Sequence, residues 1–491
     1  MPEPCDLSAI EARRLIGQKK LSPVELLDSC LARIDSVDGT LNAITALDAD
    51  GARRAAKQAE AEVMAGAELD LLHGLPVGVK DLSATAGLRT TWGSLLFKDH
   101  IPEHDDSMVA NVRAAGGIIF AKTNTPEFGA GANTKNRVFG ATGNPFDPVM
   151  TCGGSSGGSA VALAAGMMPL ATGSDYGGSL RTPAAFCGVV GFRPSPGLVP
   201  STERASALTP FGVAGPMART LADAHLLLKA QLDVDKRDPF SSDDFARIPE
   251  QLSGIDLSSV RAAISTDLGC CPIDKAIAKA FAAKARGFRS VFGEAHDQDP
   301  EFGDGVHECF EILRGVHFAA SHRERLEQHR DLLGPNVIDN TDRALQYSLG
   351  DVAWAHAEQT RIYKRFLSLF DEVDVLICPA ASTSPFPHEQ LTVTGINGVT
   401  MPTYMRWLAI AYAPTMALAC SVCLPCGVDH LGLPFGLQVI GPNGADAVVL
   451  EIAHALEQVL AANPATARPL PDLSKLKGKA KAKTKAQSNA K

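Results

Sequence analysis

Three segments of the sequence carry residue types that could act on a carbonyl group. Two of them are rich in glycine and serine: GGSSGGS begins at Gly153, and GSDYGGSLR begins at Gly173. The third is a short apolar segment that ends in Lys80. Glycine lets the backbone adopt dihedral angles at which successive N–H groups point into one concavity, and such a concavity binds anions. The glycine-rich segments therefore predict either a phosphate cradle or an oxyanion hole beside a serine nucleophile.

The oxyanion hole is the better of these two interpretations. Neither segment continues into the Gly-Lys-Ser/Thr of a P-loop, and no Gly-x-Gly-x-x-Gly directly follows an expected strand. Residues 154–158 match the Gly-x-Ser-x-Gly elbow of α/β-hydrolases, but an elbow follows a strand directly, and residues 144–148 (NPFDP) make a poor strand. A serine can also be activated by a lysine that burial keeps neutral, and Lys80 ends an apolar strand. Taken alone, however, a lysine at a strand end is usually solvated.

Other polar residues near these segments have simpler interpretations. Asp175 and Arg181 flank the second glycine-rich turn, and we expect them to hold the loop around Ser179 rather than to bind substrate. Lys122 is a second lysine at a strand end, for which we expect a structural role. Cys152 precedes the first glycine-rich segment, and we expect it to pack or to line a pocket rather than to act as a nucleophile.

Composition and charge limit the classes of partner. The chain has 491 residues, of which 45% are hydrophobic and 21% charged, as is typical of globular proteins. Its 46 basic and 55 acidic residues give a formal net charge of −9, which argues against a broad nucleic-acid surface. Residues 407–428 form an uncharged run long enough to span a membrane, but Pro414 and Pro425 interrupt it, and we interpret it as buried core. The N-terminal residues, with Glu3 and Asp6, do not resemble a signal peptide.

The cysteines indicate a reducing compartment. Eleven cysteines are sparse in a chain of this length, and most lie in apolar segments, where a thiol behaves as a small hydrophobic side chain. Cys420, Cys423 and Cys426 form the closest group, but a structural zinc site needs four ligands. The nearest candidate for the fourth, His430, follows a proline-containing apolar segment. We therefore expect buried thiols, no metal and a cytoplasmic protein.

Hydrophobic periodicity predicts strands that alternate with helices. This alternation predicts an α/β fold with a mixed, twisted β-sheet that helices cover on both faces. We expect one large domain over residues 1–473, whose helical N-terminal part spans about 6–66, and a flexible tail over the lysine- and alanine-rich residues 474–491. Helices are expected at 22–37, 50–65, 108–115, 160–166, 215–230, 274–291 and 345–372, and strands at 75–80, 116–121, 373–378 and 435–440.

Taken in order, Lys80, the GGSSGGS segment and the GSDYGGSLRTP segment resemble the amidase signature family. The separation of 24 positions between Ser155 and Ser179 agrees with the spacing in that family. The resemblance extends over most of the chain, through residues 22–35, 116–128 (GGIIFAKTNTPEF), 187–197 and 433–441 (LPFGLQVIG).

The resemblance implies a Ser-cisSer-Lys triad. Ser179 would be the nucleophile, and Ser155 would be the bridging serine, joined to Gly154 by a cis peptide bond. Lys80 would be the base, and burial would have to lower its pKa by several units from about 10.4. The oxyanion hole would consist of the backbone N–H groups of Tyr176, Gly177, Gly178 and Ser179.

The resemblance also implies an activity, namely hydrolysis of a small carboxamide, anilide or carbamate through a seryl acyl-enzyme, without metal or cofactor. Phe128, Gly154 and Cys152 are candidate substrate contacts, and Phe146, Phe318, Tyr404 and Trp407 are candidate apolar walls. The expected partner is a small-molecule amide, with neither nucleic acid nor membrane, and a second copy of this chain is a candidate partner in a homodimer.

The alternative function is that of an A-type amidotransferase subunit, which supplies ammonia within a tRNA-dependent complex. Such subunits usually carry a Ser-Leu-Asp-Gln-type stretch after the nucleophile, and residues 208–216 (LTPFGVAGP) depart from it.

Overall fold

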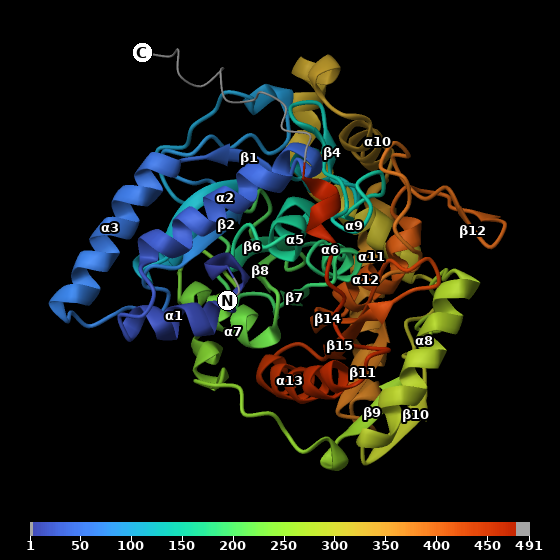
Figure 1. Ribbon diagram of the computed structural model, residues 1–491. Coiled ribbons are helices and arrows are strands. Elements are labelled where there is room, and N and C mark those ends of the chain that lie inside the picture. The colour runs from blue at the N-terminus through green and yellow to red at the C-terminus, as the bar shows by residue number, and fades with distance from the viewer. Residues whose placement is uncertain (1–2, 478–491) are drawn as a thin grey trace.

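The computed structural model describes residues 3–477, and its strands form one large sheet and two short ribbons (Figure 1). The strands of the large sheet are β1 (Ile44–Leu47), β2 (Pro76–Lys80), β3 (Ile118–Thr123), β6 (Leu170–Asp175), β7 (Val190–Arg193), β8 (Val213–Ala218), β9 (Arg261–Ile264), β10 (Glu294–Asp297), β11 (Val375–Pro379), β14 (Cys420–Val428) and β15 (Pro434–Gly441). The ribbons pair β4 (Lys135–Asn136) with β5 (Gly140–Ala141) and β12 (Gly395–Ile396) with β13 (Val399–Thr400). The order in the large sheet is β1-β3-β2-β6-β8-β7-β14-β15-β11-β9-β10.

Strand direction decides which loops meet at one edge of this sheet. β2 pairs in parallel with both β3 and β6, so the carboxyl ends of these three strands lie at the same edge. Every residue of β2 and β3 is buried, as expected for parallel strands that helices cover on both faces. Lys80, the last residue of β2, is thereby placed beside the loop that follows Asp175 at the end of β6.

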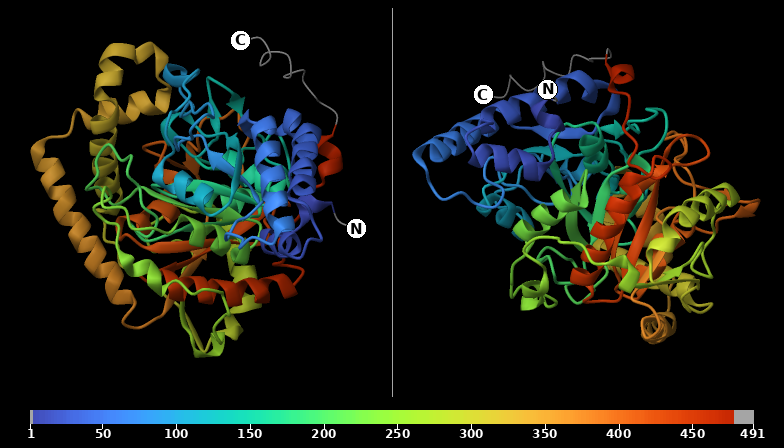
Figure 2. Two further views of the ribbon diagram at one scale, coloured as in Figure 1. Left: turned by 90° about the vertical axis from the view of Figure 1, so that its left-hand side faces the viewer. Right: turned by 60° about the horizontal axis from the view of Figure 1, so that its bottom comes forward.

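Helices cover both faces of the sheet. They are α1 (Ala9–Gly17), α2 (Pro23–Leu41), α3 (Ala49–Ala65), α4 (Ser107–Ala114), α5 (Gly157–Ala164), α6 (Arg181–Cys187), α7 (Leu221–Gln231), α8 (Lys275–Phe288), α9 (Val306–His329), α10 (Pro335–Ala344), α11 (Leu349–Leu369), α12 (Ala409–Met416) and α13 (Asp446–Ala462). Helices α5 and α6 pack against each other and against the central strands. Helices α7 and α13 form a second pair that does the same. Figure 2 (left) shows α1–α3 (blue) and α9–α11 (yellow to orange) on opposite sides of the molecule. The predicted α/β class, with a mixed sheet covered by helices, is confirmed.

The expected helix at 22–37 is confirmed as α2, and its start follows from a capping box. The Ser22 hydroxyl accepts a hydrogen bond from the Val24 N–H, and the Glu25 carboxylate accepts one from the Ser22 N–H. Pro23 occupies the first turn, where its missing N–H costs nothing.

The expected helix at 215–230 is wrong in its first part. Residues 213–218 form β8, which lies inside the sheet between β6 and β7, and the helix α7 begins only at Leu221. Gly215 lets β8 approach its neighbour, because a Cβ atom there would lie 2.3 Å from the Phe192 carbonyl oxygen. The helix starts where Thr220 caps it by accepting a hydrogen bond from the Asp223 N–H.

Two further regions differ from the expectations. The 24-residue helix α9 was not predicted, although it contributes to the site described below. The chain also stays ordered beyond the predicted domain boundary: Leu476 is buried, and the Thr40 hydroxyl donates to its carbonyl oxygen at 3.0 Å. The remaining part of the predicted tail, residues 478–491, lies outside the described residues.

The uncharged run at 407–428 is buried core, as expected. It is divided between α12 and β14, and all of α12 is buried. Within residues 3–477, none of the helices combines the length and the apolar character that crossing a bilayer would require.

We expect Ser22→Ala to lower the free energy of unfolding by about 1 kcal/mol, because the first turn of α2 loses its cap. Denaturant-induced unfolding followed by circular dichroism measures this change. Ser253→Ala, at an exposed position, is the control. Equal unfolding midpoints for the two variants would contradict the role of the cap.

Candidate active site

Lys80 is buried among hydroxyl groups. Its side chain is 1% exposed, and Nζ lies 2.8 Å from Ser155 Oγ, 2.8 Å from Ser156 Oγ and 2.9 Å from Ser174 Oγ. Burial lowers the pKa of Lys80 to about 7, and the nearby Asp175 carboxylate partly opposes this shift. A large fraction of Lys80 is therefore an uncharged amine at neutral pH, in contact with a serine that can give up a proton.

The two glycine-rich segments meet beside Lys80. The peptide bond between Gly154 and Ser155 is cis, and Ser155 is 3% exposed. The Ser156 N–H donates a hydrogen bond to the Ser179 carbonyl oxygen at 3.2 Å, which joins the first segment to the second. The structure thus places Lys80 and Ser155 in direct contact, and it places the backbone of Ser179 against the residue that follows Ser155.

Asp175 holds the loop that carries Ser179. Its carboxylate accepts hydrogen bonds from the N–H groups of Gly178 (2.8 Å) and Leu180 (3.0 Å). It also forms buried ion pairs with Arg181 (3.0 Å) and Arg193 (3.3 Å). Burial by itself would raise the pKa of Asp175, but the two guanidinium groups outweigh it and hold the pKa well below the ordinary value. The predicted roles of Asp175 and Arg181 are confirmed, whereas Arg193 was not predicted.

The loop presents free backbone donors. Among the described residues, no hydrogen bond engages the N–H groups of Tyr176, Gly177 or Ser179. The N–H of Gly178 already donates to Asp175, so the set of four donors implied by the resemblance is reduced to three. Gly178 has a φ of +114°, and a Cβ atom there would lie 2.6 Å from the Ala411 Cβ, so only glycine fits.

Solvent reaches this part of the core at a few residues only. Between residues 151 and 195, every residue is buried except Ser174, Tyr176 and Ser179, which are partly exposed. Gly129 is also partly exposed, and a Cβ atom there would lie 3.3 Å from Ser155 Oγ. These four residues mark where the contacting segments reach solvent, and we call this part of the surface the opening.

Aromatic and histidine rings pack against Tyr176 and Phe128 next to this opening. The Tyr176 ring lies 5.2 Å from that of His317 and 6.3 Å from that of Phe310, both on α9. The partly exposed Phe128 packs on His322 of the same helix, with ring centroids 4.6 Å apart. Helix α9 was missed in the sequence, although Phe310 and His317 are seven positions apart, a spacing that places them on one helical face.

The other expected pocket residues divide into two groups. The rings of Phe318 and Tyr404 both contact the guanidinium group of Arg314, which lies on α9. Trp407 instead packs on Phe386, and Phe146 lies in a turn where its N–H donates to Asn144. Cys152 is fully buried, and burial raises the pKa of its thiol to about 12.

Lys122 lies outside this arrangement. Its Nζ donates to Ser83 and Thr85, and burial lowers its pKa to about 8 although Asp81 opposes the shift. These contacts tie the loop after β2 to β3, which fits the predicted structural role.

The cysteines of β14 do not converge on one point. Cys420 and Cys423 lie at the registers of Gly441 and Gln438 on β15, and the Cys420 thiol points to the Pro442 carbonyl oxygen. Within residues 3–477, the group of side chains with metal-ligand spacing is Glu3, Cys5 and Asp6, and Arg33 already pairs with both of its carboxylates.

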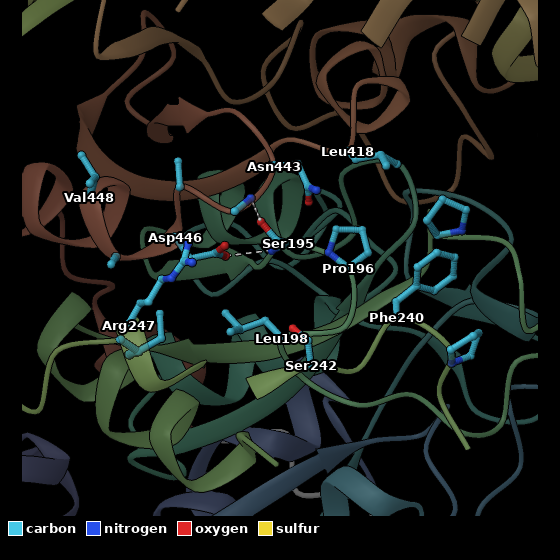
Figure 3. A pocket seen from close by; sticks show the side chains of 16 residues that line it. Ser195, Pro196, Leu198, Phe240, Ser242, Arg247, Leu418, Asn443, Asp446 and Val448 are labelled. Atoms are coloured by element: carbon cyan, nitrogen blue, oxygen red, sulfur yellow. Dashed lines mark hydrogen bonds between the residues drawn. The ribbon is translucent and has the colours of Figure 1, made fainter. Parts of the chain in front are cut away.

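A separate cavity of about 570 Å³ lies between the loop after β7 and the start of α13 (Figure 3). Polar groups of its wall form hydrogen bonds with one another. The Asp446 carboxylate accepts a hydrogen bond from the Ser195 N–H, and the Ser195 hydroxyl accepts one from the Gly444 N–H, both at 2.8 Å. None of Lys80, Ser155 and Ser179 lines this cavity.

Comparison with known proteins connects this geometry to one family. The Amidase family model matches residues 25–450. An acylamidase from Rhodococcus erythropolis is 31% identical to 92% of this chain and 95% of its own length. The A-type subunit of the glutamyl-tRNA(Gln) amidotransferase from Anaeromyxobacter dehalogenans is 34% identical, over 95% of this chain and 99% of its own. The structure of a bacterial aryl acylamidase of the amidase signature family aligns with a TM-score of 0.84 at 27% identity, over 93% of this chain and 96% of that one.

We expect Asp175→Asn to lower the free energy of unfolding by about 3–5 kcal/mol, because two buried guanidinium groups lose their counter-charge. Thermal and chemical unfolding measure the loss. Asp342→Asn, which breaks an exposed pair with Arg330, is the control, with an expected change below about 1 kcal/mol. Similar losses in both variants would show that the buried pairs do not determine the stability of the loop.

Proposed function

Because this chain belongs to the amidase signature family, we propose that it hydrolyses the C–N bond of a small-molecule amide through an acyl-enzyme on Ser179. The observation that carries this proposal is the contact of 2.8 Å between Nζ of the buried Lys80 and Ser155 Oγ. A neutral amine in contact with a hydroxyl is a base that can arm a serine without a histidine.

In the proposed reaction, the Ser179 hydroxyl attacks the amide carbonyl carbon. As the C–O bond forms, the Ser179 proton passes to Ser155 Oγ, and the Ser155 proton passes to Lys80 Nζ. The negative charge on the carbonyl oxygen faces the free N–H groups of Tyr176, Gly177 and Ser179, where preorganised donors stabilise it. When the C–N bond breaks, the amine takes back a proton through the same relay. A water molecule then attacks the ester carbonyl and gives its proton to the same relay, which releases the acid and restores Ser179. The relay itself involves only side chains of this chain.

Two serines beyond the triad position the base. Ser156 Oγ and Ser174 Oγ both lie within 3 Å of Lys80 Nζ, so they orient the amine toward Ser155. Because these neighbours are neutral hydroxyls, they do not fix Lys80 in its charged form, as a carboxylate at the same distance would.

The substrate class follows from the ring-lined opening and from the relatives. Phe128, Tyr176 and His317 favour aromatic or aliphatic amides, and two similar proteins are named acylamidase and aryl acylamidase. We infer a linear carboxamide, with anilides and carbamates as related candidates. Gly154 and Cys152 border the site through the backbone of the first glycine-rich segment.

A second candidate function, that of an A-type amidotransferase subunit, is favoured by a relative of that name at 34% identity. The two functions differ in what the isolated chain does. Turnover of simple amides without any added protein supports the hydrolase, whereas glutaminase activity that appears only with a partner supports the amidotransferase. One chain supplies the whole proposed triad, so the proposed reaction does not require a second copy of the chain. The expected homodimer therefore stays a prediction.

We expect Ser179→Ala to lower kcat/KM for amides at least about 1,000-fold, because no other hydroxyl replaces the nucleophile. A panel of amides, anilides, esters and carbamates, each tested with the wild type and the variant, measures this and identifies the preferred class. Ser253→Ala is the control, and full activity of Ser179→Ala would exclude the assigned nucleophile.

We expect kcat/KM to rise about tenfold per pH unit below an apparent pKa near 7 and to level off above it, because only the neutral form of Lys80 accepts a proton. Activity is therefore lost as the pH falls and Lys80 becomes charged. The measurement is a pH profile from about 5 to about 9 with an uncharged anilide, accompanied by a circular dichroism control for folding. A rate that stays constant down to the acid end of this range would contradict Lys80 as the base.

A further inference from the structure

Arg314 is a buried cation whose contacts are with neutral groups. It lies on α9 with 5% of its surface exposed, and its Nη1 donates to the Asn340 side-chain oxygen. Its guanidinium carbon lies 4.3 Å from the ring centroid of Phe318 and 5.4 Å from that of Tyr404. Such ring contacts stabilise a cation but do not neutralise it.

The acidic side chains near Arg314 are bound to other arginines. Glu311 pairs with Arg406 at 2.9 Å, and Asp339 pairs with Arg343 at 2.9 Å. Across residues 3–477, no carboxylate lies within ion-pair distance of Arg314. This neighbourhood therefore holds three guanidinium groups and two carboxylates, and one positive charge is left without a counter-ion. Burying an unpaired charge is costly, so such a charge is a good candidate for pairing with a ligand.

Two buried polar atoms on residues that lie within the electrostatic influence of Arg314 lack partners. Tyr176 Oη and His317 Nδ1 are both buried and make no hydrogen bond among the described residues. Their rings lie 5.2 Å apart, and His317 follows Arg314 by one helical turn on α9. Burial raises the pKa of Tyr176 and lowers that of His317 to about 4, and the Arg314 charge contributes to the lowering of the His317 pKa. At neutral pH the tyrosine is thus a hydroxyl donor, and the imidazole is uncharged.

We propose that Arg314, Tyr176 Oη and His317 Nδ1 bind a carboxylate of the substrate, so that the substrates include amides with an anionic group outside the scissile bond. The proposal rests on the proposed function and adds the substrate class. The guanidinium supplies the counter-charge, while the hydroxyl and an Nδ1–H tautomer of the imidazole supply two further donors. Tyr176 lies three residues before Ser179, so this subsite and the reacting carbonyl share one loop.

The test uses two pairs of amides in which an isopropyl group replaces the carboxylate. On the acyl side, the 4-nitroanilide of glutaric acid is compared with that of 5-methylhexanoic acid. On the amine side, 4-acetamidobenzoate is compared with 4-isopropylacetanilide. We expect the wild type to prefer the acid at least about 10-fold in kcat/KM in one pair. Arg314→Met should lower kcat/KM for that acid about 10–100-fold and for its uncharged analogue less than about 3-fold, as expected for a charge-assisted hydrogen bond.

Variants separate charge recognition from packing. Arg314→Lys keeps the charge and should retain part of the preference, whereas Arg323→Gln, on an exposed pair with Glu327 of the same helix, should leave it unchanged. Equal losses for acid and analogue in Arg314→Met would overturn the proposal, because they would show that Arg314 only supports the fold. Absence of any preference in the wild type would overturn it as well.

A binding measurement keeps this test independent of catalysis. In the Ser179→Ala background, where the anilides stay intact, calorimetry compares binding of each pair with and without Arg314→Met. If the acid binds more tightly than its analogue, and if Arg314→Met abolishes this difference, the subsite is supported. This holds even if the wild type turns over no amide. Lack of turnover would refute the proposed function and not the subsite. Equal binding of acid and analogue in both proteins overturns the subsite.

Discussion

The proposed chemistry of this protein depends on keeping one amine, that of Lys80, out of water. Lys80 ends a strand whose neighbours run in parallel on both sides, so its side chain enters the core rather than the solvent. Burial brings its pKa to about 7, and the hydroxyls around it form hydrogen bonds with the amine without imposing a positive charge. Had the fold placed a carboxylate in contact with Nζ, the amine would stay protonated and could not serve as a base.

A charged network next to this neutral one fixes the loop that carries Ser179. Asp175 lies at the end of β6 and is shared by Arg181 on α6 and Arg193 at the end of β7. The same carboxylate takes up the Gly178 N–H and leaves three neighbouring N–H groups free. In the proposed reaction the two networks act together, because one sets the proton affinity of Lys80 while the other orients the N–H groups that we assign to the carbonyl oxygen.

The groups that we assign to the reaction and those that we assign to substrate recognition come from different parts of the chain. The proposed triad lies on β2 and on the two glycine-rich segments, whereas Arg314 and most of the rings near Tyr176 lie on α9. This division fits a family whose members differ in the molecules that they are named for. Changes on α9 can therefore alter the preferred substrate without altering Lys80 or its serines.

The sequence by itself determined the parts that depend on local chemistry. The glycine-serine runs, the lysine at the end of an apolar strand and the capped start of α2 can each be recognised within a short stretch of residues, and the structure contains all of them. The pairing of Asp175 with Arg181 was predictable for the same reason, because these residues flank one turn.

Only the tertiary structure decided the contacts between distant segments. Arg193, the placement of Ser156 and Ser174 around Lys80, and the approach of α9 to Tyr176 depend on strand order and helix packing, which no local pattern encodes. Residues 213–218 show the same limit, since sheet pairing with β6 and β7 prevailed over the apparent helical pattern. The proton affinity of Lys80 belongs to this class as well, because burial is a property of the whole fold.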